Sequence, residues 1–132
     1  MTPPLSALLW LTALAPAGAQ DLGMGVDLSG KAAIDFGLDL AAATLANGGM
    51  NPVTKEQIID PIHCQHVLAV MVTAGLYENS GDWLYETGLP GKSGVAGGMT
   101  TVAPGKGGLG TFAPLLDEAG NSIKGQLAAR FL

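Results

Sequence analysis

The sequence predicts a small α+β domain in which helices pack on a small antiparallel sheet. Two segments in the first half of the chain have helical composition, three short segments after them resemble strands, and the last segment again has a helical apolar period. The length of 132 residues suits one small domain. The hydrophobic fraction is 48%, mostly Ala, Leu and Val, which favours a core of small side chains.

Charge and cysteine content narrow the classes of function. Six basic and eleven acidic residues give a net charge of −5 without a basic cluster, so we expect no binding to nucleic acid. The single cysteine, Cys64, allows no internal disulfide framework. Histidines at positions 63 and 66 flank it, but this spacing matches no zinc pattern and has no acidic partner at helical spacing. We therefore expect no metal site.

The N-terminal residues 1–19 contain an apolar run. Residues 5–17 are nearly all apolar but too short for a stable membrane span, which needs roughly 20 residues. Residues 17–19 (Ala-Gly-Ala) form a small-residue cleavage pattern, although no Lys or Arg precedes the run. Residues 1–19 are therefore either a signal peptide, which implies a periplasmic or secreted protein, or an unrelated apolar leader. The Gly- and Asp-rich residues 20–37 predict a loop.

Two helices are expected next. The first covers residues 38–46, which are rich in Ala and Leu, and residues 47–49 (Asn-Gly-Gly) end it. Asp60 precedes a proline and starts the second helix, which runs over residues 62–73. Because its apolar residues lie on more than one face, we expect this helix to be buried over much of its surface.

Three strands and a helix are expected in the second half. The strands cover residues 83–85, 99–103 and 109–113, and their short connections predict an antiparallel meander. Asn121 and the serine after it can cap a final helix over residues 123–131. Three residues form the apolar line of this helix: Ile123, Leu127 and Phe131.

The glycine-rich residues 88–98 are the first candidate for a binding surface. They read as a turn that runs into a short strand, and glycines in a strand often mark a close approach of backbone or ligand. Lys92 places a cation beside backbone N–H groups that no side chain covers, an arrangement that suits a carboxylate or a developing oxyanion. The alternative is a glycine-rich surface hairpin with a solvated lysine.

Four segments, taken together, resemble one protein family. They are residues 43–52, 75–81, 88–98 and 116–125. Their order and spacing are similar to the C-terminal part of the serine-dependent glutaminases, which have the fold of β-lactamases and penicillin-binding proteins. The resemblance covers residues 38–132, and it implies a partial serine β-lactamase-like α+β fold.

The resemblance also implies a site. Tyr77 matches the tyrosine that lines the glutamine site and is implicated in proton transfer with the nucleophilic serine. Val95 matches the valine whose backbone binds the substrate amide oxygen in an oxyanion hole. Lys92, Ser93 and Gly94 resemble the Lys-Thr-Gly strand of the wider fold and would support the site. An amide carbonyl under attack gains negative charge, and each backbone N–H that receives it is worth roughly 3 kcal/mol.

One motif of the family is missing from this sequence. The nucleophile of the family lies in a Ser-x-x-Lys motif, and no serine here is followed by lysine three residues later. Two hypotheses follow. The chain belongs to a glutaminase that hydrolyses L-glutamine to L-glutamate and ammonia through a serine acyl-enzyme, or it is a truncated, inactive segment that at most binds or oligomerises.

The resemblance has further implications for cofactors, location and assembly. It implies neither a metal nor an organic cofactor, and it implies a cytoplasmic location. A partial fold leaves sheet edges unpaired and helices without packing partners, so we expect a homo-oligomer.

A third hypothesis is an exported α+β binding domain with a pocket beside the glycine-rich strand. It rests only on the general preference of ligands for concave sites.

Overall fold

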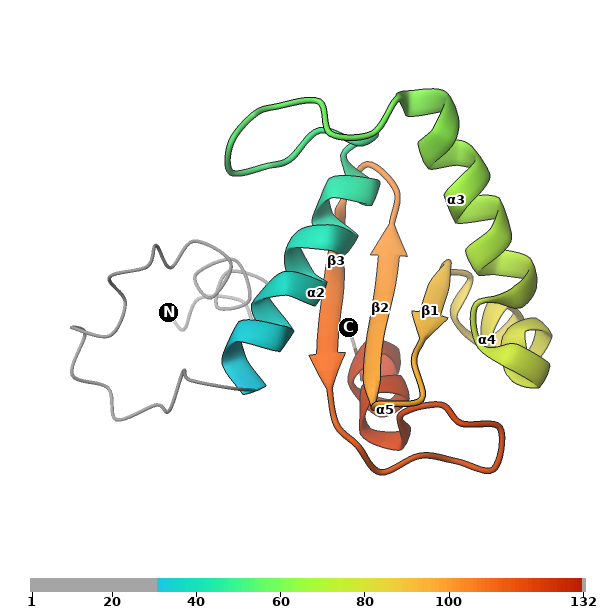
Figure 1. The fold of residues 1–132 in the computed structure, drawn as a ribbon. Helices are drawn as coiled ribbons and strands as arrows, with labels where there is room; N and C mark the ends of the chain where they lie inside the picture. The colour runs from blue at the N-terminus through green and yellow to red at the C-terminus, as the bar shows by residue number, and fades with distance from the viewer. Residues whose placement is uncertain (1–30, 132) are drawn as a thin grey trace, which may run out of the picture.

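A three-stranded antiparallel sheet forms the centre of the computed structural model, which describes residues 31–131 (Figure 1). Its strands are β1 (Gly91–Ser93), β2 (Gly98–Ala103) and β3 (Gly107–Phe112), in the order β1-β2-β3. Tight turns join the strands, as the glycine and proline residues between them predict.

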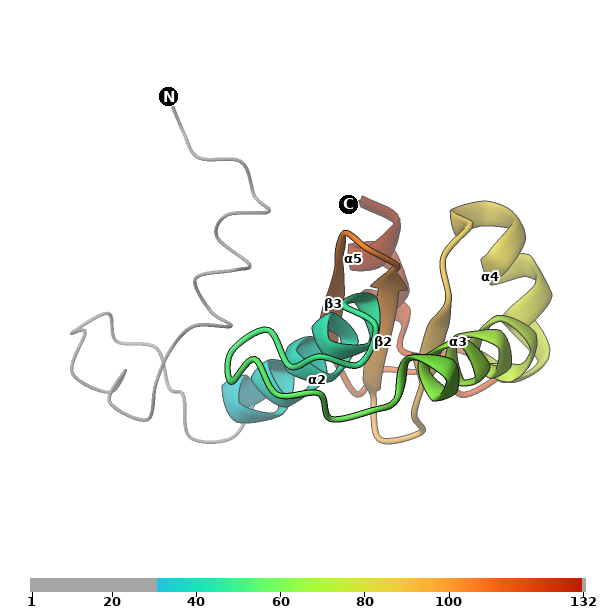
Figure 2. The ribbon, with the colours of Figure 1, turned by 90° about the horizontal axis from the view of Figure 1, so that it is seen from above.

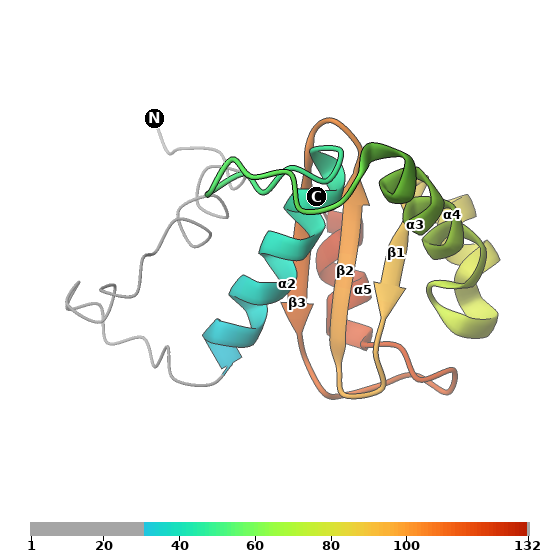
Figure 3. The ribbon, with the colours of Figure 1, turned by 45° about the horizontal axis from the view of Figure 1, so that its top comes forward.

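Helices cover both faces of this sheet, as Figure 2 shows from above. Helix α2 (Lys31–Ala46) contacts β2 and β3 from one face, and α5 (Ile123–Phe131) contacts the same two strands from the other. Helix α3 (Pro61–Ala74) and the shorter α4 (Ser80–Thr87) lie at the β1 side (Figure 3). The predicted α+β class, with a C-terminal helix on a small antiparallel sheet, is confirmed.

The prediction of a strand over residues 83–85 is wrong. These residues belong to α4, and the third strand of the sheet is β1 instead. Side chains two residues apart share one face of a strand, yet Trp83 is 3% exposed and Tyr85 is 93% exposed, which a helix permits. Gly88 ends α4 in a left-handed conformation with φ 68°.

The loop predicted for residues 20–37 is wrong over its last part. Helix α2 begins at Lys31, where Ala-Ala follows and favours a helix. The rest of that loop and the apolar residues 1–19 lie outside the described residues. The predicted end of the helix is confirmed, because Gly48 and Gly49 adopt φ values of 64° and 90° that suit a helix C-terminus.

Helix α3 begins as predicted but is far less buried than expected. The Asp60 carboxylate accepts a hydrogen bond from the Ile62 N–H at 3.0 Å and caps the helix. Only Cys64 and Met71 are buried in α3, whereas Val70 is 63% exposed. Helix α3 is apolar, as the sequence indicates, but the other described residues cover only one of its sides.

Helix α5 covers the predicted residues, but its apolar line does not face the sheet. Gly125 and Ala129 are buried, whereas all three residues of the predicted line are exposed. A Cβ at Gly125 would lie 2.7 Å from Thr111 Oγ1, so the absence of a side chain lets α5 approach the sheet closely. Small residues therefore form the contact.

Two apolar clusters fill the two sides of the sheet. One combines residues of α2, α3 and β2: Ala42, Ala46, Met71 and Val102. The other lies beneath α5: Leu76, Trp83, Met99 and Ala129. Alternate residues of β2 supply the two clusters, as the pleat of a strand requires. None of the helices within residues 31–131 has the length and apolar character to cross a membrane.

Candidate active site

The candidate site residues lie where the end of α3 meets β1. The Ser93 N–H donates to the Gly75 carbonyl at 2.9 Å. A Cβ on Gly75 would lie 1.7 Å from the Gly91 carbonyl oxygen, so the two backbones can meet only because position 75 has no side chain. This contact brings Tyr77, two residues after Gly75, beside the strand that carries Lys92.

Tyr77 has a left-handed backbone, with φ 54°, and its side chain reaches the last residue of β1. Its hydroxyl donates to the Ser93 carbonyl at 3.3 Å. The Lys92 ammonium lies 4.8 Å from the centre of the Tyr77 ring and donates to the same carbonyl. A phenol and a cation therefore converge on one backbone oxygen.

Val95 lies in the turn that follows β1. The Gly97 N–H donates to the Gly94 carbonyl at 2.8 Å and closes this turn, with Val95 at its second position. Among residues 31–131 the Val95 N–H has no hydrogen-bond partner, and the residue is 72% exposed. A Cβ on Gly94 would meet only the Gly98 oxygen, at 3.8 Å, so the backbone before Val95 is open.

Gly120 shows that Tyr77 and Val95 lie side by side. A Cβ on Gly120 would lie 3.6 Å from Val95 Cγ1 and 3.8 Å from Tyr77 Cε2. We call the surface formed by Tyr77, Val95 and residues 92–94 the Tyr77/Val95 surface. The structure thus brings all five predicted site residues together, and it adds Gly120, which sequence reasoning missed as a neighbour of the site.

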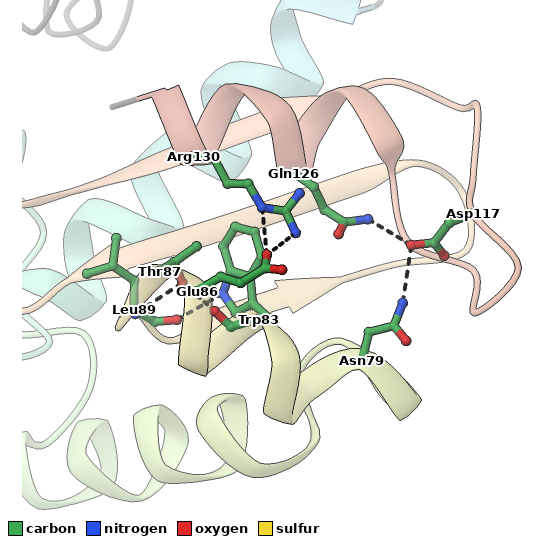
Figure 4. Close-up of polar contacts among 8 residues, drawn as sticks. All are labelled: Asn79, Trp83, Glu86, Thr87, Leu89, Asp117, Gln126 and Arg130. Carbon is green, nitrogen blue, oxygen red and sulfur yellow. Dashed lines mark hydrogen bonds and ion pairs between the residues drawn. The ribbon is translucent and has the colours of Figure 1, made fainter.

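The carboxylate of Asp117 organises the loop that carries Gly120 (Figure 4). It accepts hydrogen bonds from the Asn121 N–H at 2.8 Å, the Gln126 amide at 2.8 Å and the Asn79 amide at 3.4 Å. Burial raises the pKa of Asp117, but the hydrogen bonds from Asn121 and Gln126 outweigh it and hold the pKa below its usual value. No local sequence pattern could have shown that these four residues meet.

The Tyr77/Val95 surface is open rather than enclosed. A hollow of about 420 Å³ lies elsewhere, between the end of α2 and the turn from β2 to β3, and Ala46, Val53 and Gly105 help to line it. Neither Tyr77 nor Val95 lines it. In the described part of the chain, no three His, Cys, Asp or Glu side chains lie close enough together to hold a metal ion.

Comparison with known proteins decides the family. A family model described as glutaminase matches residues 36–132. The chain belongs to the glutaminase family. Glutaminase 2 of Yersinia pestis is 73% identical to it over 95 residues, which cover 72% of this chain and 28% of that relative.

Solved glutaminase structures agree with this assignment. A probable glutaminase, ybaS, superposes with a TM-score of 0.70 at 45% identity, over 73% of this chain and 31% of that chain. The glutaminase YbgJ of Bacillus subtilis, solved as a covalent complex with 5-oxo-L-norleucine, gives a TM-score of 0.68 at 33% identity, over 71% and 34%. The chain thus spans about a third or less of the length of these relatives and matches their C-terminal part.

Proposed function

We propose that this chain supplies one side of a site at which L-glutamine is hydrolysed to L-glutamate and ammonia. The observation that carries the proposal is the Tyr77/Val95 surface, where the side chains of Tyr77 and Val95 both border Gly120 and the Val95 N–H has no hydrogen-bond partner among residues 31–131. Membership of the glutaminase family supports glutamine as the substrate.

Each group on this surface has a chemical task in the proposed reaction. A serine hydroxyl attacks the side-chain amide of glutamine, ammonia leaves, and water then releases glutamate from the acyl-enzyme. The Val95 N–H would stabilise the oxygen that becomes negative during attack. The Tyr77 hydroxyl would pass the proton between the serine and the leaving nitrogen, with the Lys92 ammonium beside it.

The serine itself has to come from outside this sequence. None of the five serines has the Ser-x-x-Lys spacing, and covalent catalysis needs the activated nucleophile. We therefore propose that the chain alone does not release ammonia from glutamine. Measurable turnover by the purified chain that Tyr77→Phe abolishes would contradict this proposal.

A chimera with a relative tests the substrate and the site together. The 95-residue matching segment of the Yersinia pestis glutaminase 2 is replaced by the corresponding residues of this chain. The 73% identity favours a folded product, and we expect ammonia release from L-glutamine. A chimera that folds but leaves glutamine intact would show that this chain does not supply a working glutamine site.

We further propose that the isolated chain self-associates through α3. Helix α3 contains no Asp, Glu, Lys or Arg, and Val70, Ile62 and Val67 are exposed. A helix that is apolar around its circumference is normally buried, and interface centres are depleted of charged residues. A second copy of α3 would cover this face by a two-fold contact. The exposed apolar line of α5 is flanked by Lys124 and Arg130, which makes it the weaker candidate.

Light scattering after size-exclusion chromatography tests this assembly. We expect a dimer or larger species, which Val70→Lys converts into a monomer. The matched control is Leu127→Lys on the exposed side of α5, which should leave the assembly intact. A monomeric unmodified chain, or dissociation by Leu127→Lys alone, would contradict assembly through α3.

A further inference from the structure

The backbone of Tyr77 has an unusual conformation for an aromatic residue. Its φ of 54° lies in the left-handed region, which bulky residues rarely adopt because the Cβ approaches the backbone. Such conformations persist only where the surrounding structure enforces them, and they concentrate at functional sites. The direction of the Tyr77 side chain depends on this conformation, so the groups that enforce it also aim the hydroxyl.

Ser80 binds one backbone group of Leu76 and one of Tyr77 itself. Its hydroxyl oxygen accepts a hydrogen bond from the Leu76 N–H at 3.0 Å and donates its own proton to the Tyr77 carbonyl at 2.7 Å. Ser80 is 3% exposed, so water cannot easily replace it. Removal of this one hydroxyl would break both hydrogen bonds.

Asn121 binds the same stretch of backbone, at the Leu76 carbonyl. Its side-chain amide donates to the Leu76 carbonyl at 3.2 Å, and Asn121 is fully buried. Asp117 fixes Asn121 in turn, since its carboxylate accepts the Asn121 N–H. Figure 4 shows Asp117 between Asn79 and Gln126, so the loop that carries Asn121 is bound both to α5 and to the turn after Tyr77.

We propose that Ser80 and Asn121 are positioning residues that hold Tyr77 in its left-handed conformation and thereby aim its hydroxyl at the Ser93 carbonyl. The inference deepens the proposed function, on which the role of Tyr77 in catalysis rests. The side chains of both residues bind backbone groups of Leu76 and Tyr77 and make no hydrogen bond to the Tyr77 hydroxyl or the Val95 N–H, so neither is a catalytic residue. Without their hydrogen bonds, the backbone of Tyr77 would relax to a right-handed φ and the ring would leave Lys92.

Nuclear magnetic resonance of the full chain tests this without any substrate. A left-handed residue gives a strong intraresidue cross-peak between its amide and α protons. We expect this cross-peak for Tyr77 in the unmodified chain, together with contacts from its ring to Lys92 and Val95. Ser80→Ala and Asn121→Ala should each weaken the cross-peak and remove the ring contacts.

Two further variants separate positioning from general stability. Ser80→Thr keeps the hydroxyl and should restore the Tyr77 signals. Ser122→Ala is a matched control, since it also removes a buried serine hydroxyl that makes two hydrogen bonds, here to Ala113 and Gly125. It should leave the Tyr77 signals unchanged. Unchanged Tyr77 signals in both Ser80→Ala and Asn121→Ala, or equal changes in Ser122→Ala, would overturn the proposal.

A measurement on the unmodified chain covers the case in which a variant does not fold. The Asn121 side-chain amide protons should exchange slowly with solvent and show contacts to the Leu76 and Tyr77 backbone. Rapid exchange without those contacts would overturn the proposal. Because none of these readouts needs glutamine, the failure of glutamine hydrolysis in the chimera would leave the positioning result intact, and the reverse also holds.

Discussion

The glycines of β3 and the glycine that follows β1, Gly94, have different surroundings. In β3, a Cβ on Gly110 would lie 2.3 Å from the Asp39 nitrogen, and one on Gly108 would lie 2.4 Å from the Ala42 Cβ. These glycines let α2 pack directly on the strand. After β1, a Cβ on Gly94 would meet only one atom, at 3.8 Å. A glycine with crowded surroundings serves packing, whereas a glycine beside open space leaves the backbone accessible to a ligand.

The largest effect on stability is expected in strand β3, whose glycines pack closely against α2. In Gly110→Ala, the new methyl group would collide with the α2 backbone, which cannot move aside as a side chain can. We expect a loss of about 3 kcal/mol in the free energy of unfolding, measured by chemical denaturation. Gly94→Ala is the matched control and should change this free energy by less than about 0.5 kcal/mol. Equal losses of unfolding free energy in the two variants would show that Gly94 and Gly110 do not differ in this way.

Substitution of Gly94, which leaves stability almost unchanged, should lower catalytic activity. In the chimera with the Yersinia pestis relative, Gly94→Ala places a methyl group beside the Val95 N–H without disturbing the fold. Loss of an oxyanion donor costs roughly 10²-fold or more, and we expect partial obstruction to lower kcat/KM by about tenfold. Unchanged kcat/KM at unchanged stability would show that the turn after β1 is not part of the site.

Acid should destabilise the loop that carries Asp117 and Gly120 before it destabilises strand β3. The pKa of Asp117 in the folded chain is lowered from 3.8. Its stabilising hydrogen bonds are therefore fully effective above that value and are lost as the pH falls through the lower, folded pKa. We expect amide exchange around Gly120 to rise in this range earlier than exchange in β3. Asp117→Asn should remove this dependence, while Glu118→Gln, at an exposed neighbour, should retain it.

The local signals in the sequence predicted much of the fold. Asp60 before a proline located the start of α3, and the glycines at positions 48 and 49 located the end of α2. Residues 83–85 were wrongly predicted to form a strand, because three apolar residues are too few to distinguish a helical period from a strand. The burial of α3 could not be predicted, because it depends on which elements cover the helix and not on its own residues.

The site was predicted by a different route. Tyr77 and Val95 were found by resemblance to a family, since 18 positions separate them in the sequence and no period connects them. The residues that hold Tyr77 carry no such signal. Ser80 reads as a turn residue and Asn121 as a helix cap, and only the structure shows that both bind the backbone of Leu76.

The smallest effect concerns the second non-glycine residue with a left-handed backbone. Lys55, with φ 64°, lies in an exposed loop whose side-chain hydrogen bonds, from Asn51 and Thr54, are exposed to solvent, in contrast to the buried Ser80 and Asn121 beside Tyr77. Lys55→Asn should raise the free energy of unfolding by about 0.5 to 1 kcal/mol, because Asn tolerates this conformation better. Lys106→Asn removes the same charge from an exposed turn and should have no such effect. A loss of stability in Lys55→Asn would indicate that the lysine side chain itself contributes.

The most direct test of the proposed site compares the two tyrosines of the chain in the active chimera. Ammonia release from L-glutamine is measured for Tyr77→Phe and for Tyr85→Phe, in which an exposed hydroxyl on α4 is lost. We predict that Tyr77→Phe lowers kcat by about 10²-fold or more, as expected for loss of a proton-transfer group, while Tyr85→Phe retains full activity. Full activity of Tyr77→Phe would contradict the assignment of the Tyr77/Val95 surface as the glutamine site.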